Sequence, residues 1–264
     1  MENAHEMVRM AHIRKTFNPG SVNERTVFRD FSLTLARGDF LCVVGSNGSG
    51  KTTLLNLLCG SLPADAGEIS VGGRRIDRLR EHRRARFIGR VFQNPAMGTC
   101  AELTILENLA LADNKGRPYL LRGAVNRRRA DAYRAMLEPL GLGLENRLTS
   151  KVGLLSGGQR QALTLLMATL NQPKLLLLDE HTAALDPKTA DKVLQLTEEI
   201  VARDHLTTLM VTHNMKHAIQ YGNRLIMMDA GRVVVDIRGE EKKNLTVSDL
   251  LEKFNIENDR MLLS

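Results

Sequence analysis

Several residue types and patterns are scarce in this chain of 264 residues. There is no tryptophan, and aromatic residues make up only 4% of the sequence, so the stacking platforms of single-stranded nucleic-acid binders are not expected. The apolar runs, such as residues 175–178, are far shorter than the ~20 residues that cross a bilayer. The first ten residues lack the charged and then apolar pattern of a secretory signal. These absences favour a cytoplasmic globular protein that does not itself span a membrane.

Cysteine is also scarce. The three residues, Cys42, Cys59 and Cys100, are odd in number and lack the spacing of metal ligands. The pattern indicates neither a disulfide framework nor a zinc site, and we expect buried, reduced thiols.

Positive charge is in excess. The chain has 37 lysines and arginines and 30 acidic residues, which give a net charge of +7. Such a charge favours approach to any polyanion but does not choose one. Arginines concentrate at residues 74–86 and 127–129 without interleaved aromatics, which predicts solvated helix faces and no nucleic-acid partner. The remaining composition, 43% apolar and 25% charged, is typical of a globular chain, and its length fits one composite domain over residues 1–264.

Hydrophobic patterning predicts two kinds of sheet. Short strands at residues 8–13, 26–28 and 31–35 indicate an antiparallel β layer. The continuous apolar run at residues 40–44 is typical of a strand buried on both faces, and a helix is expected at residues 52–59.

The second half of the chain alternates between helices and strands. Helical patterns occur at residues 103–112, at 127–140 and again after residue 156. A βαβ unit follows, and it predicts a parallel sheet. We expect its strands at residues 175–178 and 207–211 around a helix at 187–202, then a hairpin of residues 224–228 and 232–237, and a C-terminal helix capped by Thr246 and Asp249.

A phosphate-binding loop is the strongest single motif, because a G-x-x-x-x-G-K-[ST] sequence stands between the buried strand and its helix. Its backbone N–H groups and the helix N-terminus cradle phosphates, the lysine adds charge, and the threonine hydroxyl can ligate Mg²⁺. The motif predicts a P-loop NTPase core that binds a nucleotide. Its residues are Gly45, Ser46, Asn47, Gly48, Ser49, Gly50, Lys51 and Thr52, with Thr53 beside them.

Two adjacent carboxylates, Asp179 and Glu180, end the apolar strand of residues 175–178. Ligands gather at the carboxyl edge of open parallel sheets. We expect Asp179 to hold Mg²⁺ directly or through its water shell, and Glu180 to polarise the water that attacks the γ-phosphate.

A second phosphate-binding helix end is predicted at Ser156, Gly157, Gly158 and Gln159. One nucleotide is expected to use only one such end. The spare end therefore suggests a composite site, in which the serine and glycines of one subunit meet the nucleotide of another.

With these motifs in place, the sequence resembles the ATP-binding subunits of ABC transporters over nearly its whole length. Gln93 looks like the Q-loop glutamine, which also contacts the metal, and His213 like the switch histidine. Asp186 lies in a segment similar to the D-loop, and Phe17 stands where an aromatic side chain stacks on adenine. Taken alone, Phe17 also fits a core or turn aromatic.

Two positions depart from the commonest pattern, because His181 replaces a proline and Ala183 a serine. Neither change removes a catalytic group, and we expect His181 to pack or hydrogen-bond. The stretch of residues 179–187 is similar to that of a less characterised importer group, whose members pair with a small permease and a substrate-binding protein.

The resemblance implies an α/β fold with a P-loop core, a parallel sheet, an N-terminal antiparallel β layer and an inserted helical subdomain. The expected core covers residues 1–93 and 157–240, the helical subdomain 94–156 and the C-terminal helix 241–264. The implied function is ATP hydrolysis that drives solute transport. It implies a dimer of two copies closed over two ATP molecules, peripheral at the cytoplasmic face of the membrane, with an integral-membrane permease docked near residues 95–101.

Two alternatives share the nucleotide motifs. One is a soluble assembly ATPase such as those that serve iron–sulfur scaffolds, which needs no permease. The other is an exporter subunit, since the permease largely sets the direction of transport.

Overall fold

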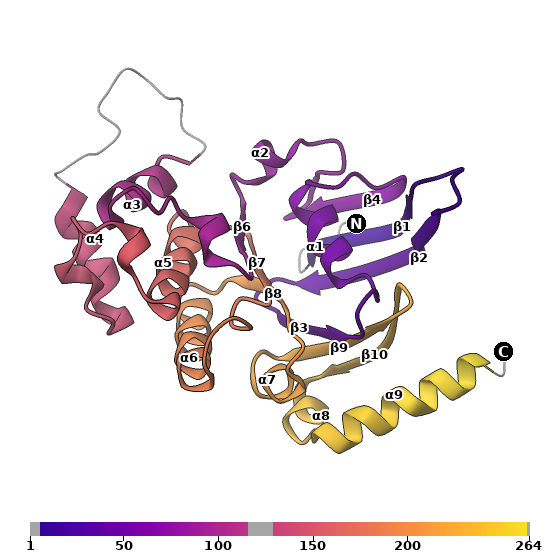
Figure 1. Ribbon diagram of the computed structural model, residues 1–264. Helices are drawn as coiled ribbons and strands as arrows, with labels where there is room; N and C mark the ends of the chain where they lie inside the picture. Colours follow the sequence, from indigo (N-terminus) through magenta and orange to yellow (C-terminus); the bar gives the residue numbers. More distant parts are fainter. Residues whose placement is uncertain (1–5, 116–128, 263–264) are drawn as a thin grey trace.

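The computed structural model describes residues 6–115 and 129–262, which form two β-sheets with helices between and around them (Figure 1). The smaller sheet is antiparallel and has the order β2-β1-β4-β5. This confirms the expected N-terminal antiparallel layer. Its strands are β1 Glu6–Phe17, β2 Arg25–Ala36, β4 Ala66–Val71 and β5 Arg74–Arg75.

The larger sheet has the order β10-β9-β3-β8-β7-β6. All neighbouring strands from β9 to β6 pair in parallel, and β10 adds an antiparallel edge through the predicted hairpin. This confirms the parallel α/β core. The strands are β3 Phe40–Gly45, β6 Ile88–Val91, β7 Leu175–Asp179, β8 Thr207–Val211, β9 Arg224–Asp229 and β10 Arg232–Arg238.

Alternate side chains of the central strands enter two different cores. In β7, Leu175 and Leu177 pack with the antiparallel sheet and with α1, whereas Leu176 and Leu178 pack with the helices on the opposite face. Successive side chains of a strand point to opposite faces, so apolar residues at every position are needed when both faces are covered. The continuous leucine run is the cause of this three-layer arrangement.

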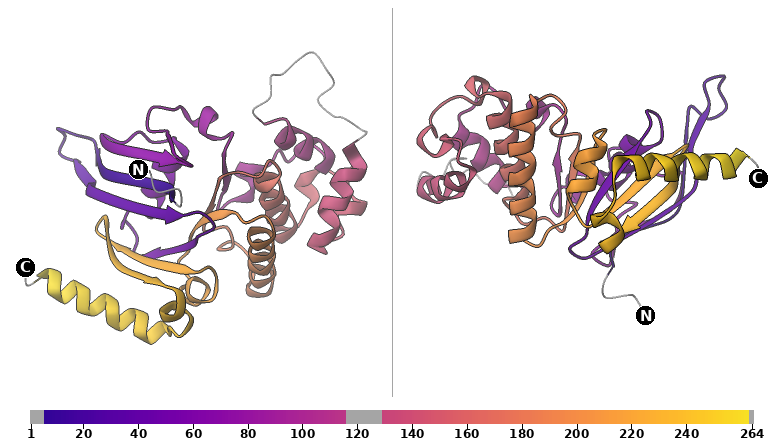
Figure 2. Two further views of the ribbon diagram at one scale, coloured as in Figure 1. Left: turned by 180° about the vertical axis from the view of Figure 1, so that it is seen from behind. Right: turned by 90° about the horizontal axis from the view of Figure 1, so that it is seen from below.

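One group of helices gathers at the end of the molecule opposite the antiparallel sheet. Helices α3 to α6 lie at that end, while α9 runs along the hairpin of β9 and β10 (Figures 1 and 2). Within residues 6–115 and 129–262, no helix is both long and apolar enough to cross a membrane. The helices are α1 Lys51–Cys59, α2 Glu81–Arg84, α3 Ile105–Asp113, α4 Ala130–Leu137, α5 Gly157–Thr169, α6 Pro187–Arg203, α7 Met215–Gln220, α8 Gly239–Lys243 and α9 Val247–Leu262.

Two segments differ from the sequence expectations. The strands predicted at residues 26–28 and 31–35 are one strand, β2. The charged residue between them, Asp30, points outward and hydrogen-bonds His12 at 2.9 Å, beside an irregularity in the strand pairing. The strand therefore continues through it. The predicted helix of residues 127–140 ends early, since Pro139 lies in a 3₁₀ turn that follows α4. The first two residues of that predicted helix lie outside the described residues.

The prediction of a solvated arginine face is wrong for Arg84, which is only 2% exposed. Its guanidinium donates to the carbonyls of Leu57 and Leu58 in the last turn of α1, at 2.6 and 3.1 Å. Carbonyls at a helix C-terminus have no partner within the helix, and a cation there satisfies them. The expectation of buried thiols fits Cys42 and Cys59 but not Cys100, which is exposed.

Candidate functional site

The phosphate loop joins the end of β3 to the start of α1 and depends on its glycines. Gly45 has φ +150°, and a Cβ there would lie 2.1 Å from the carbonyl oxygen of Met228. Gly50 has φ +107°, and a Cβ would lie 2.9 Å from the ring of Phe28. Any side chain at these positions would therefore displace the loop from the sheet.

The loop surrounds a lysine and a buried hydroxyl. The Lys51 ammonium donates to the carbonyl oxygens of Gly45 and Ser46 at 2.8 and 2.9 Å. Burial lowers the pKa of Lys51, an effect opposed by the nearby negative charge of Glu180. The Ser49 hydroxyl is buried and has no hydrogen-bond partner among the described residues. A buried cation and an unpaired hydroxyl beside a helix N-terminus fit an anionic ligand rich in acceptor oxygens.

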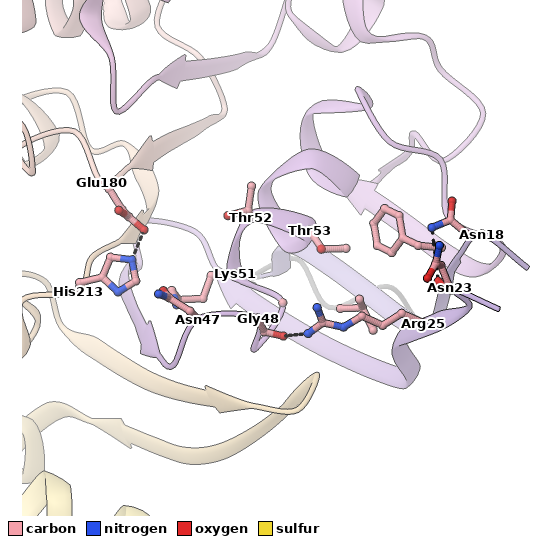
Figure 3. A pocket seen from close by; sticks show the side chains of 13 residues that line it. Asn18, Asn23, Arg25, Asn47, Gly48, Lys51, Thr52, Thr53, Glu180 and His213 are labelled. Carbon is pink, nitrogen blue, oxygen red and sulfur yellow. Dashed lines mark hydrogen bonds and ion pairs between the residues drawn. The ribbon is translucent and has the colours of Figure 1, made fainter. Parts of the chain in front are cut away.

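A cavity of about 420 Å³ opens in front of this loop (Figure 3). It brings together loop residues, the adenine-stacking candidate and the two groups predicted to act on the attacking water. They are Phe17, Asn47, Gly48, Gly50, Lys51, Thr52, Thr53, Glu180 and His213. Phe17 lies at the end of β1 and is half-buried, with the Lys15 ammonium 5.7 Å from its ring centroid.

Glu180 and His213 lie together at the edge of the cavity. The Nε2 atom of His213 lies 2.6 Å from Oε1 of Glu180. Glu180 has φ +46°, which is uncommon for a residue with a side chain, and its N–H donates to the carbonyl oxygen of Val211 at 3.0 Å. Strained backbone of this kind costs about 1–3 kcal/mol and gathers at functional sites. The strain here turns the carboxylate out of β7 and toward the histidine.

Asp179 directly precedes Glu180 and forms an ion pair with an arginine. Its Oδ2 atom accepts a hydrogen bond from Arg90 at 2.8 Å, and both side chains are 15% exposed. Its Oδ1 atom accepts no hydrogen bond from the described residues. Gln93 is exposed and does not line the cavity, whereas Thr52 does. The three residues predicted to contact metal are thus not gathered at one point.

The serine and glycine motif opens α5 in a different place. Ser156 caps this helix, since its hydroxyl accepts from the N–H of Gln159 at 3.3 Å and its own N–H donates to the Gln159 side chain at 3.1 Å. Ser156, Gly158 and Gln159 line a second cavity of about 280 Å³ that shares no residue with the first. Gly157 begins α5 and packs against Leu185. The two helix ends predicted to bind phosphate therefore do not share a cavity within one chain.

Asp186 caps the next helix, α6, through a hydrogen bond from the N–H of Thr189 at 3.1 Å. Hydrogen bonds from Thr189 lower the pKa of this carboxyl. Gly158 packs against the same threonine, because a Cβ at Gly158 would lie 2.2 Å from its methyl group. Asp186 and the serine end of α5 are thus joined through one residue.

His181, the departure from the common pattern, is buried and 2% exposed. Its Nε2 atom lies 3.1 Å from the hydroxyl of Thr197, which itself donates to the carbonyl oxygen of Val193 at 2.7 Å. Since that hydroxyl has one proton, it accepts from Nε2 of the histidine. Nε2 of the imidazole therefore carries a proton, and burial lowers the pKa of the ring to about 4.

Two cationic residues near the site were missed from the sequence. Arg25 lines the first cavity from β2 and donates to the carbonyl oxygen of Gly48 at 3.0 Å (Figure 3). Arg90 lies on β6, three residues before Gln93. An arginine within an apolar strand signals that it needs a partner, but the partner depends on which strands are neighbours in the sheet.

Comparison with known proteins decides the family. The sequence model of the protein family described as ABC transporter matches residues 28–183. The chain belongs to the ABC transporter family. A tyrosine transport ATP-binding protein of Clostridioides difficile is 46% identical over 248 residues, which cover 94% of this chain and 98% of that protein. The lipoprotein-releasing system ATP-binding protein LolD 1 of Caulobacter vibrioides is 36% identical, with 86% and 94% covered.

Solved structures of ATP-binding cassettes match the fold. The ADP conformation of MJ1267, a cassette of an ABC transporter, has a TM-score of 0.78 and 27% identity, with 95% of this chain and 98% of that chain covered. A dimeric post-hydrolysis state of the cassette MJ0796 with ADP and Pi has a TM-score of 0.74 and 29% identity, with 88% and 98% covered. This chain is an ATP-binding subunit that hydrolyses ATP to energise transport, and such cassettes work as dimers with transmembrane permease partners.

Proposed function

We propose that this chain powers the import of an amino acid from the cytoplasmic face of the cell membrane, where a permease and a substrate-binding protein complete the transporter. The observation that carries its ATP-hydrolysing role is the cavity that joins the phosphate loop to Glu180 and His213. The similarity to a tyrosine transport subunit supports an aromatic amino acid as the substrate class.

In this proposal, the first cavity binds ATP. Phe17 stacks on adenine, while residues 45–53 surround the phosphates and the Lys51 ammonium exchanges its loop carbonyls for phosphate oxygens. Glu180 orients and polarises the attacking water, and His213, already 2.6 Å from it, hydrogen-bonds the γ-phosphate. Gln93 is exposed and outside the cavity lining, so its role in this proposal requires its loop to move.

Magnesium fits the chemistry of the predicted donors, which the structure does not gather at one point. Thr52 offers a hydroxyl, and Asp179 offers a carboxylate oxygen that accepts no hydrogen bond from the described residues. Both are the hard oxygen ligands that this cation prefers. Thr52, Asp179 and Gln93 would hold the ion, which when bound neutralises charge on the phosphates.

Two copies of the chain close head to tail over two ATP molecules. Each nucleotide lies between the loop of one copy and Ser156, Gly157, Gly158 and Gln159 of the other, with Asp186 at the interface. The separation of the two cavities supports this arrangement, since one chain alone leaves the second helix end unused. Closure transmits force to the permease, and hydrolysis resets the dimer.

The permease docks beside residues 95–101. Two large apolar side chains are exposed in and near this segment, Met97 at 68% and Leu154 at 71%. Glu102, paired with Lys151 at 2.9 Å, adds charge at its border. We expect Glu102→Arg to reduce assembly with the permease and transport, and unchanged assembly and transport would show that this docking surface is wrongly assigned.

Purification of the tagged chain from gently solubilised native membranes, with ATP and vanadate, tests the whole proposal. Mass spectrometry should identify a stoichiometric polytopic permease together with a binding protein. Recovery with soluble scaffold proteins alone would instead favour an assembly ATPase. A permease whose reconstituted vesicles move substrate outward would favour an exporter.

A further inference from the structure

Arg90 links three parts of the nucleotide site from beneath. It belongs to β6, whose Val91 pairs with Leu178 in the parallel neighbour β7, and Asp179 follows directly. Its Nη2 atom donates to Oδ2 of Asp179 at 2.8 Å. Its Nη1 atom donates to Oδ1 of Asn56 at 2.9 Å and lies 3.1 Å from Sγ of Cys59. The same guanidinium stacks on the ring of Phe92, 4.7 Å from the centroid.

These contacts fix a cation under the site predicted for magnesium. Asn56 lies four residues after Thr52 in α1, so both residues occupy the same face of the helix, one turn apart. Phe92 directly precedes Gln93. Arg90 therefore contacts Asp179 directly. It reaches the other two residues proposed to contact the metal, Thr52 and Gln93, through their neighbours Asn56 and Phe92.

The ion pair is largely removed from water, because both side chains are 15% exposed. A buried carboxylate without a partner is strongly destabilising, so it requires either an arginine or another cation. Arg90 supplies that charge through one oxygen of Asp179 and leaves the other oxygen without a partner among the described residues. The protein thus balances this carboxylate with a resident positive charge.

We propose that Arg90 is a positioning residue that acts as a built-in counter-ion of Asp179 and thereby limits how tightly the site holds magnesium together with nucleotide. The inference rests on the magnesium site in the proposed function. A fixed cation beside Asp179 weakens the field that attracts a divalent cation. It also attracts the phosphates, so it supports nucleotide binding when magnesium is absent. Both effects reduce the benefit that magnesium adds.

The test measures the dissociation constant of a fluorescent ADP analogue in EDTA and in saturating Mg²⁺. The ratio is the dissociation constant in EDTA divided by that in Mg²⁺, so a larger ratio means a larger benefit from magnesium. Linkage makes this ratio a direct measure of coupling between metal and nucleotide. Arg90→Gln keeps polar atoms but removes the charge, and we expect the ratio to rise on the order of tenfold over wild type. Arg90→Lys keeps the charge and should leave the ratio within about threefold of wild type.

A second variant guards against misfolding of Arg90→Gln. Asn56→Asp leaves Arg90 in place but puts another carboxylate against it, and we expect the ratio to rise in the same direction. Melting curves establish that each variant is folded. An unchanged or smaller ratio in both variants would overturn the counter-ion role. If Arg90 were purely structural, removing or neutralising its charge would not increase the benefit that magnesium adds. A wild-type ratio of one would instead refute the magnesium site itself.

Discussion

Replacement of His181 by glutamine should remove a large part of the acid sensitivity of this protein. Burial lowers the pKa of the imidazole from 6.5 to about 4, with a smaller contribution from the charge of His217. The folded state therefore holds this ring neutral, while the unfolded chain protonates it as the pH falls below about 6.5. Glutamine retains an N–H donor for the Thr197 hydroxyl but does not titrate.

The expected magnitude follows from the difference between the two pKa values. Because the folded pKa is depressed, the stability contribution of His181 is complete above pH 6.5 and is lost as the pH falls toward 4. The full loss is about 3 kcal/mol, at about 1.4 kcal/mol per pH unit. Between pH 7.5 and pH 5, the loss amounts to about 2 kcal/mol.

Urea denaturation of wild type and His181→Gln at pH 7.5 and pH 5 measures this loss. Without nucleotide, the free energy of unfolding of wild type should fall by about 2 kcal/mol more than that of the variant. The comparison between proteins cancels the other titrating groups. An equal fall in both proteins would refute the assignment of His181 as a buried neutral residue.

Three further substitutions test other parts of the structure. Lys51→Met should weaken ATP binding at least tenfold, since an uncompensated phosphate charge costs more than about 1.4 kcal/mol, and unchanged binding by calorimetry would argue against the phosphate loop. Phe17→Ala should weaken ATP binding by about 1–3 kcal/mol, whereas Phe17→Tyr should not. Equal ATP affinities of Phe17→Ala and wild type would contradict the stacking role. Arg84→Met leaves the last carbonyls of α1 without donors and should lower the free energy of unfolding by about 3 kcal/mol, so a loss below about 1 kcal/mol in urea titrations would contradict its capping role.

The fold followed from patterns whose physical cause is local. The leucine run of residues 175–178 predicts a strand covered on both faces, and the two cores of the structure use its alternate side chains. Likewise Thr246 and Asp249 form the expected cap of the C-terminal helix, with the threonine hydroxyl 3.2 Å from the N–H of Asp249. Local hydrogen bonds and periodic burial are visible in sequence because both partners lie close together in the chain.

Contacts between distant segments could not be predicted in this way. Arg84 looks like one member of an exposed basic cluster, and only the structure shows that it reaches α1, more than twenty residues earlier. The pair of Arg90 and Asp179 is separated by 89 positions and depends on which strands are neighbours in the sheet. Strand order comes from the packing of the whole molecule, and so do the ion pairs that it creates.

The most direct test of the central claim is the behaviour of Glu180→Gln. If Glu180 activates the attacking water, steady-state ATP hydrolysis should fall by about 10²- to 10⁴-fold. The affinity for ATP should change little, and ATP should hold the variant as a dimer on size-exclusion chromatography while wild type dissociates. The exposed glutamate Glu199, changed to glutamine, provides the matched control and should hydrolyse ATP at the wild-type rate. Normal hydrolysis by Glu180→Gln would contradict the account.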